Sequence, residues 1–230
     1  MKLRAALFDA VGTLIELREP VGESYARLAQ AHGAQLSARR LESGFAAATK
    51  QVPLPQLADC QRAQREARER DWWREVVART LAAAGRGPRE FDAYFAELYQ
   101  HFASPQSWQL RSGCAEALLE LRARGLATGI VSNFDQRLHE ILQGLELQPL
   151  LDVVVLPTDA AARKPDPRIF HAALAHLGVA AEQAIYLGDD AALDLAGSRS
   201  AGLRALDVAH LATLAELPDL LNTLELEPDA

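Results

Sequence analysis

The feature that most constrains the fold is the alternation of apolar runs and helical patterns that begins near residue 113. Short apolar runs, typical of buried strands, occur at residues 127–131, 153–156, 184–187 and 203–206. Segments with helical spacing or capping signals separate these runs. Such alternation predicts a parallel sheet with helices on both faces. We therefore expect an α/β fold with a doubly wound, Rossmann-like parallel sheet.

A long helical segment interrupts this pattern directly after the first strand. Residues 3–8 form the first apolar run, which ends at Asp9. Helical patterns then follow at residues 24–31, 36–49, 61–84 and 91–102, and turn-forming sequences rich in proline and glycine separate them. We expect a core domain made of residues 1–16 and 107–230, with residues 17–106 inserted as an all-helical cap domain.

Composition excludes several classes of protein. The chain has 230 residues with a formal net charge of −7 and shows no basic stripe, which argues against a nucleic-acid binder. No apolar run reaches the roughly 18 residues that a membrane span needs. The two cysteines form neither a metal-binding spacing nor a disulfide framework, so we expect a reduced, cytoplasmic compartment. The sequence does not predict an oligomeric state.

Polar side chains follow the predicted strands, at the edge of the sheet where ligands bind in open parallel sheets. Asp9, Ser132, Lys164 and Asp189 each follow a strand or lie in the loop after one. An aspartate can attack phosphorus and form an aspartyl phosphate, and carboxylates are suitable ligands for Mg²⁺. The lysine supplies a compact positive charge, and the hydroxyls of Ser132 and Thr13 supply further donors to a phosphate. Together these carboxylates, the lysine and the hydroxyl groups predict a phosphate-binding site beside a divalent metal ion.

Four ordered motifs resemble those of the haloacid dehalogenase-like (HAD) hydrolase superfamily. They are residues 7–14 (LFDAVGTL), 131–133 (VSN), 164–170 (KPDPRIF) and 188–194 (GDDAALD). The inserted helical segment resembles the cap of subfamily I. Residues 21–26 (VGESYA), 72–73 (WW) and 132–135 (SNFD) further resemble the branch described as HAD-like hydrolase domain-containing 3, or REG-2-like.

The resemblance implies a hydrolase that acts on a small phosphorylated metabolite with Mg²⁺ as cofactor. By this resemblance Asp9 is the nucleophile, and Lys164 assists catalysis. The implied phosphate-binding residues are Gly12, Thr13, Ser132, Asn133 and Lys164. The implied metal ligands are Asp9, the backbone carbonyl of Val11 and Asp189, with Asp190 and Asp194 as supporting residues around them.

Val11 departs from the phosphatase pattern Asp-x-Asp-Gly-Thr, in which the second aspartate is the general acid/base. Valine cannot carry a proton, although its carbonyl can still bind a metal. Loss of a positioned acid/base typically costs on the order of 10²–10⁴ in rate. Three functions therefore stay open: a weakened or specialised phosphatase, a regulatory relative that binds a phosphorylated ligand without efficient turnover, and a metal-independent 2-haloacid dehalogenase. Because the segment from Asp189 to Asp194 keeps its acidic residues, we favour the metal-dependent hydrolase.

Overall fold

The computed structural model describes residues 2–58 and 60–226, and the chain divides into two units. A parallel sheet forms the centre of the first unit. This unit comprises Met1–Glu16 and Gln109–Ala230. In the described residues the sheet has five strands in the order β5-β4-β1-β6-β7, and every adjacent pair is parallel. The strands are β1 (Ala5–Phe8), β4 (Ala127–Val131), β5 (Val153–Val155), β6 (Ala184–Gly188) and β7 (Arg204–Asp207).

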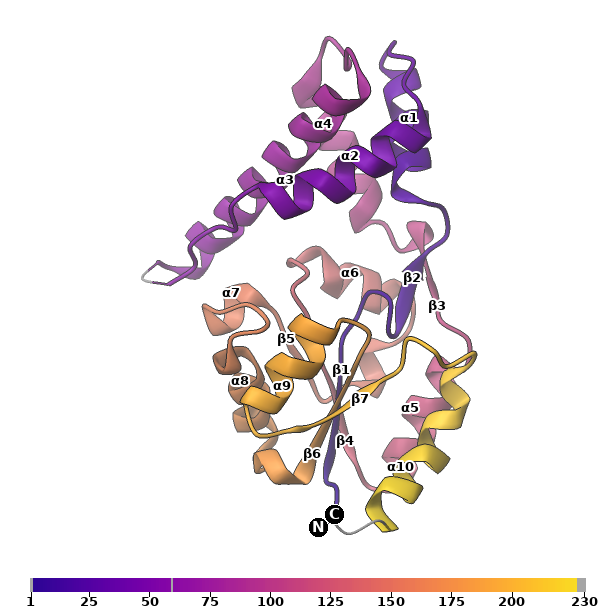
Figure 1. The fold of residues 1–230 in the computed structure, drawn as a ribbon, viewed down its shortest axis with the longest axis vertical. Coiled ribbons are helices and arrows are strands. Elements are labelled where there is room, and N and C mark those ends of the chain that lie inside the picture. Colours follow the sequence, from indigo (N-terminus) through magenta and orange to yellow (C-terminus); the bar gives the residue numbers. More distant parts are fainter. Residues whose placement is uncertain (1, 59, 227–230) are drawn as a thin grey trace. The chain divides into compact units, whose positions relative to one another are not determined.

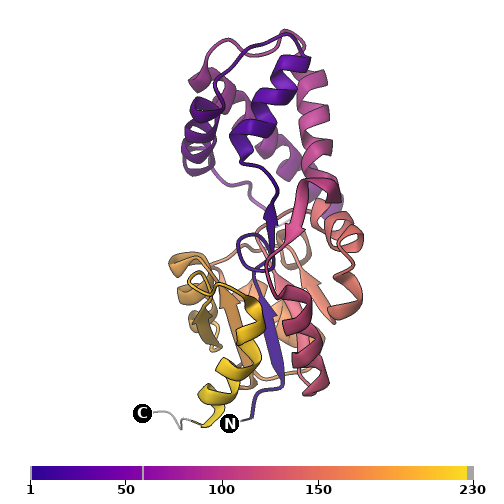
Figure 2. The same cartoon turned by 90° about the vertical axis from the view of Figure 1, so that its right-hand side faces the viewer.

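Helices cover both faces of this sheet (Figures 1 and 2). On one face lie α5 (Cys114–Ala123) and α10 (Leu217–Leu226), and on the other lie α8 (Pro167–Leu177) and α9 (Gly197–Ser200). Leu7 of β1 is paired with Tyr186 of β6, so their side chains point to the same face of the sheet. There both pack in one cluster with Phe170 of α8. The prediction of a doubly wound α/β fold is confirmed.

The remaining elements of the first unit are short and connect the strands. They are α6 (Arg137–Gly144), α7 (Pro157–Ala160), the 3-10 turns η2 (Gln148–Leu150), η3 (Ala181–Gln183) and η5 (Leu214–Glu216), and the π-helical turn η4 (Ala191–Ala196). Of these, η4 follows the carboxyl end of β6 and carries Asp194 into the site described below.

The second unit, Leu17–Trp108, is built on four helices among its described residues. These are α1 (Val21–Ala31), α2 (Ala38–Gln51), α3 (Arg62–Ala84) and α4 (Phe91–Ala103), followed by the 3-10 turn η1 (Pro105–Ser107). Its own core includes Tyr25, Leu41, Leu81, Tyr94 and Leu98. The unit lies in the segment for which the sequence predicts a helical insert, and its helices appear in indigo to magenta in Figure 2.

A pair of short strands that the sequence analysis does not predict carries the chain from one unit to the other. β2 (Ile15–Leu17) pairs with β3 (Trp108–Leu110) in a sheet of their own. Each has only three residues, which is too short for a period of two to become visible in the sequence. The unit boundaries fall inside these strands, so the second boundary lies two residues after the predicted start of the core at residue 107.

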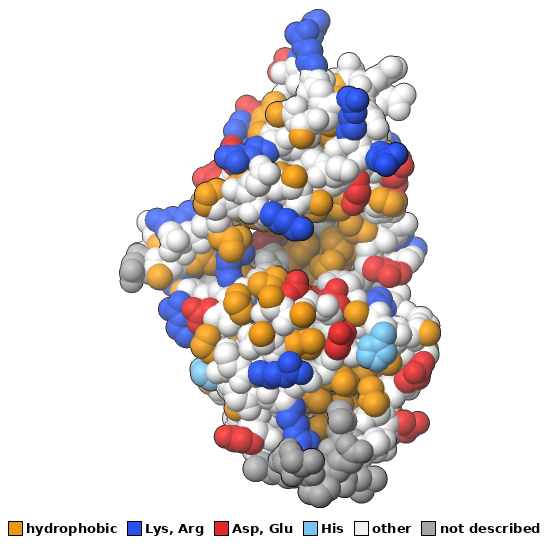
Figure 3. All heavy atoms as spheres, in the orientation of Figure 1, with side chains coloured by type: hydrophobic (Ala, Val, Ile, Leu, Met, Phe, Trp, Pro, Cys, Tyr) orange, Lys and Arg blue, Asp and Glu red, His pale blue; other side chains and the backbone are white. Residues whose placement is uncertain are grey.

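Two further observations concern membranes and charge. None of the helices within residues 2–58 and 60–226 combines the length and the apolar character that a membrane crossing requires. On the face shown in Figure 3, Lys and Arg side chains are interspersed with Asp and Glu side chains.

Candidate active site

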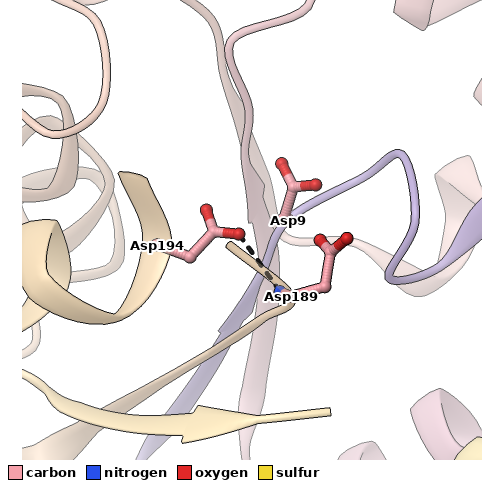
Figure 4. A group of neighbouring side chains, drawn as sticks. All are labelled: Asp9, Asp189 and Asp194. Carbon is pink, nitrogen blue, oxygen red and sulfur yellow. Dashed lines mark hydrogen bonds between the residues drawn. The ribbon is translucent and has the colours of Figure 1, made fainter. Parts of the chain in front are cut away.

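Three carboxylates meet beyond the carboxyl ends of β1 and β6 (Figure 4). Asp9 directly follows β1, and Asp189 directly follows β6. These strands are adjacent and in register, since Phe8 pairs with Leu187, so the residues after them lie side by side. Asp194 comes from η4, and one carboxylate oxygen from each of the three residues lies within 4.8 Å of the others. The structure thus brings together Asp9, Asp189 and Asp194 from motifs that are distant in the sequence.

Lys164 supplies the positive charge beside this group. Its ammonium nitrogen lies 2.6 Å from Asp9 Oδ1 and 2.6 Å from Asp194 Oδ1, and its side chain is only 3% exposed. Burial alone would lower the pKa of Lys164, but the attraction of Asp9 and Asp194 outweighs it and raises the pKa. The lysine therefore stays charged at neutral pH, between the predicted nucleophile and the carboxylate of η4.

Both carboxylate oxygens of Asp194 have protein partners. Its Oδ1 accepts from Lys164, and its Oδ2 accepts from the backbone N–H of Asp189 at 3.2 Å and of Asp190 at 3.0 Å. The carboxylate thereby fixes both the lysine and the loop that presents Asp189. Asp194 thus lies beside Asp9 and Asp189, the two carboxylates that the resemblance assigns as cation ligands.

The electrostatics of these two carboxylates favour a bound cation. Burial raises the pKa of Asp9, against the opposing effect of Lys164, and burial together with the charge of Asp194 raises the pKa of Asp189. A divalent cation bound to these oxygens would stabilise their ionised forms. The Val11 carbonyl is a third hard oxygen donor, and among the described residues it accepts no backbone hydrogen bond. Two carboxylates and a carbonyl suit Mg²⁺.

The loop after Asp9 is held in a conformation that requires glycine at residue 12. Gly12 has a φ of +90°, and a Cβ there would lie 2.6 Å from Asp189 Oδ2. Its N–H donates to the Ile15 carbonyl at 2.8 Å, and its own carbonyl accepts from Arg111 at 2.8 Å. The Thr13 hydroxyl donates to Asp189 Oδ1 at 3.3 Å. The predicted phosphate-binding residues Gly12 and Thr13 therefore also shape the surroundings of Asp189.

Gly12→Ala is expected to lower the affinity for Mg²⁺ by about tenfold, because the new methyl group displaces the Asp189 carboxylate. Gly33→Ala is the matched control, since Gly33 has a φ of +76° but a methyl group on it would meet no atom within 4 Å. Both variants should lose roughly 1 kcal/mol of stability through backbone strain. Calorimetric titration with Mg²⁺ measures the difference, and an equal affinity in the two variants would contradict the displacement of Asp189.

Ser132 and Asn133 follow β4 and hold different parts of the site. The buried Ser132 hydroxyl accepts from the Phe134 N–H at 3.3 Å. The Asn133 side chain is committed to the Lys164 backbone: its Nδ2 donates to the carbonyl at 3.0 Å, and its Oδ1 accepts from the N–H at 2.8 Å. The side chain of Asn133, for which the resemblance implies a phosphate contact, therefore holds the backbone of Lys164 in this structure.

Asp190 lies outside the cluster of three carboxylates. Its Oδ1 accepts from the N–H groups of Ala192 and Leu193 at 2.8 Å each, so that it caps η4. Its side chain therefore holds the start of the turn that carries Asp194, and its backbone N–H donates directly to that carboxylate.

Two residues that contact the site were missed in the sequence analysis. Tyr186 accepts from the Lys164 ammonium at 3.0 Å, and Arg111 donates to the Gly12 carbonyl. A tyrosine inside the otherwise apolar run 184–187 is a signal that could have been noticed, because a buried hydroxyl needs a partner. No comparable signal marks Arg111 in the sequence, because its contact with the Gly12 carbonyl depends on where the folded chain places the residue after β3.

Comparisons with known proteins agree with the four motifs. A sequence model of the family "haloacid dehalogenase-like hydrolase" matches residues 3–202. Human haloacid dehalogenase-like hydrolase domain-containing protein 3 is 36% identical over 208 residues, which are 89% of this chain and 81% of the human protein. Rhythmically expressed gene 2 protein of Drosophila melanogaster is 28% identical over 215 residues, which are 87% of this chain and 81% of the fly protein.

A solved structure shows the same fold. HAD-hydrolase YfnB from Bacillus subtilis, whose structure is described as bound to magnesium, has a TM-score of 0.70 at 16% identity. The match covers 96% of this chain and 100% of YfnB. At this identity the likeness concerns the fold alone.

Proposed function

Because the chain belongs to the haloacid dehalogenase-like hydrolases, in the branch of domain-containing protein 3, we propose that it is a Mg²⁺-dependent phosphatase that acts through an aspartyl phosphate on Asp9. The observation that carries the proposal is the position of Asp9 between Lys164 and Asp189. A lysine 2.6 Å from the nucleophile and a second carboxylate within 4.8 Å suit a phosphoryl group held beside a cation. The solved structure of YfnB, which is described as bound to magnesium, supports magnesium as the cation.

The proposed reaction begins with attack of a carboxylate oxygen of Asp9 on phosphorus. The bond between phosphorus and the leaving oxygen breaks, and the leaving group departs with the electron pair. Lys164 and the Ser132 hydroxyl stabilise the charge on the phosphoryl oxygens. Water then attacks the phosphorus of the aspartyl phosphate, which releases phosphate, regenerates Asp9 and gives its proton to the solvent. Bound Mg²⁺ supplies charge neutralisation between the carboxylates and the phosphoryl group.

Val11 determines which phosphates we expect as substrates. An aspartate at this position would protonate the leaving oxygen, whereas valine cannot. Carboxylates and phenolates depart without a proton, but an alkoxide is a poor leaving group. We therefore propose small acyl or aryl phosphates as the preferred substrate class.

The decisive experiment is turnover of acetyl phosphate and p-nitrophenyl phosphate, measured with Mg²⁺ and with a chelator. We expect phosphate release that requires Mg²⁺. Binding of phosphate analogues without release would favour the second candidate, a regulatory phospholigand-binding protein, which Val11 also supports. Halide release from a 2-haloacid in the presence of the chelator would establish a dehalogenase and overturn the proposal.

Val11→Asp is expected to raise hydrolysis of alkyl phosphates more than hydrolysis of acyl phosphates. An alkoxide gains from a proton donated as the P–O bond breaks, and a carboxylate gains less. The gain in rate for alkyl phosphates relative to acyl phosphates should lie within the roughly 10²–10⁴ range of acid/base catalysis. Imperfect placement of the new carboxyl group would bring it toward the lower end of that range. The measurement is the ratio of kcat/KM for the two substrates.

Val11→Asn is the matched control for this variant, because asparagine has nearly the shape of aspartate but no acidic proton to transfer to the leaving group. It should leave the alkyl-to-acyl ratio at the wild-type value. The idea fails if a folded, Mg²⁺-binding Val11→Asp protein keeps the wild-type ratio. It also fails if the wild-type protein already hydrolyses alkyl phosphates at about 1–10³ s⁻¹, since another residue would then supply the proton.

A further inference from the structure

We propose that Tyr186 is a positioning residue that fixes the orientation of the Lys164 ammonium in the active site. The proposal rests on the proposed function for the catalytic role of Lys164, but the geometry of the tyrosine stands independently. Tyr186 lies in β6, three residues before Asp189, and is 0% exposed. No motif assigns it a role.

The Lys164 ammonium has three N–H donors and three acceptors. Two are the carboxylate oxygens of Asp9 and Asp194, at 2.6 Å each, and the third is the Tyr186 hydroxyl at 3.0 Å. An ammonium with only two partners can rotate about its terminal bond and shift between them. The third partner removes this freedom, so that the tyrosine determines where the other two N–H groups point.

The tyrosine hydroxyl is itself fixed by its single proton. It donates to the Val131 carbonyl at 2.7 Å, and the alternative acceptor, Asp194 Oδ1, lies farther away at 3.2 Å. Donation to Val131 leaves the lone pairs of the oxygen for Lys164. Burial and the nearby carboxylates Asp9 and Asp194 raise the pKa of Tyr186 well above its ordinary value, so the phenol keeps this proton. Phe170 packs against the ring edge-on, with 5.1 Å between ring centroids.

This hydroxyl connects three motifs of the site. Tyr186 belongs to β6, and Val131 is the last residue of β4, directly before Ser132. β1, which carries Asp9 at its end, lies between these two strands. Asn133 holds the backbone of Lys164 through two hydrogen bonds, and Tyr186 accepts a hydrogen bond from the ammonium group at the end of the Lys164 side chain. The lysine is therefore restrained at its backbone and at its ammonium.

Tyr186→Phe tests the proposal, because it removes only the oxygen atom. Tyr94→Phe is the matched control: Tyr94 is also 0% exposed, and its hydroxyl donates to a backbone carbonyl, that of Tyr25, at 3.2 Å in the helical unit. Each variant removes one hydrogen bond from a buried phenol to a backbone carbonyl. Only Tyr186→Phe also removes a partner of Lys164.

The first readout follows the lysine directly and does not depend on activity. The chain has three lysines, and Lys2 and Lys50 are exposed, so labelling with ζ-¹⁵N-lysine gives a spectrum in which a slowly exchanging ammonium belongs to Lys164. We expect hydrogen exchange of this ammonium to be at least about tenfold faster in Tyr186→Phe, and unchanged in Tyr94→Phe. If Tyr186→Phe does not fold, the wild-type spectrum still decides: a Lys164 ammonium that exchanges as fast as those of Lys2 and Lys50 overturns the proposal.

The second readout is the hydrolysis of acetyl phosphate with Mg²⁺. A misoriented ammonium stabilises the transition state less, so kcat should fall by about tenfold in Tyr186→Phe while KM changes by less than about threefold. Wild-type kcat in Tyr186→Phe, or an equal loss in both variants, overturns the positioning role. Absence of turnover in the wild-type protein would contradict the proposed function, and the ammonium exchange would then decide the role of Tyr186 alone.

Discussion

Asp9→Asn is expected to reduce phosphate release by roughly 10⁴-fold or more, because the amide cannot attack phosphorus. Initial rates of acetyl phosphate hydrolysis with saturating Mg²⁺ measure the loss. Asp152→Asn is the control, since Asp152 pairs with Arg122 before β5, at the opposite end of the sheet, and should keep wild-type turnover. Substantial turnover in Asp9→Asn would contradict Asp9 as the nucleophile.

The same substitution is expected to raise the midpoint of thermal unfolding in metal-free buffer. Burial raises the pKa of Asp9, so the folded state binds its proton more tightly than the unfolded state does. At pH 7 the ionised carboxylate therefore lowers the free energy of unfolding. This cost shrinks as the pH falls below the raised pKa of Asp9 and is gone once the pH is below the ordinary pKa of an aspartate. An asparagine carries no such charge. A variant that is inactive and yet more stable would show that the site keeps a destabilising carboxylate for its chemistry.

Lys164→Met is expected to lower the free energy of unfolding by about 3–5 kcal/mol at pH 7. The substitution leaves the buried carboxylates of Asp9 and Asp194 without their cation. Attraction to these carboxylates outweighs burial and raises the pKa of Lys164, so its contribution is present at neutral pH and is lost only as the pH rises through that raised value. The defect should shrink toward acidic pH, where Asp9 takes up a proton. Urea unfolding at pH 7 and pH 5 measures both effects.

Lys50→Met is the matched control for this substitution, because Lys50 is an exposed residue near the end of α2. It should change the free energy of unfolding by less than about 0.5 kcal/mol. If Lys164→Met were no less stable than Lys50→Met, the ion cluster would not hold the site together as described.

The sheet and the main site residues could be predicted because their signals are local. Residues 127–131 are a strand in the structure, as their apolar run predicts, and the helices of the second unit lie within a few residues of their patterns. Asp9 and Asp189 could be expected to meet because parallel strands end at the same edge. Each of these inferences needs only the spacing of apolar residues along the sequence and the position of a polar residue directly after a strand.

The contacts that could not be predicted depend on tertiary packing. Nothing near Asn133 in the sequence indicates that its amide binds the backbone of Lys164, thirty-one residues later. The link from Tyr186 to Val131 requires knowing that β6 and β4 flank β1, and strand order is not visible in a single sequence. The three-residue strands β2 and β3 stabilise each other only once both are in place.

The most direct measurement is to trap the phosphoryl group on the protein. The protein is mixed with acetyl phosphate and Mg²⁺, quenched with acid and digested, and its peptides are analysed by mass spectrometry. We predict one phosphoryl group on the peptide that contains Asp9, which is absent without Mg²⁺ and absent from Asp9→Asn. Continued phosphate release with no phosphoryl group on Asp9 would contradict the aspartyl-phosphate mechanism.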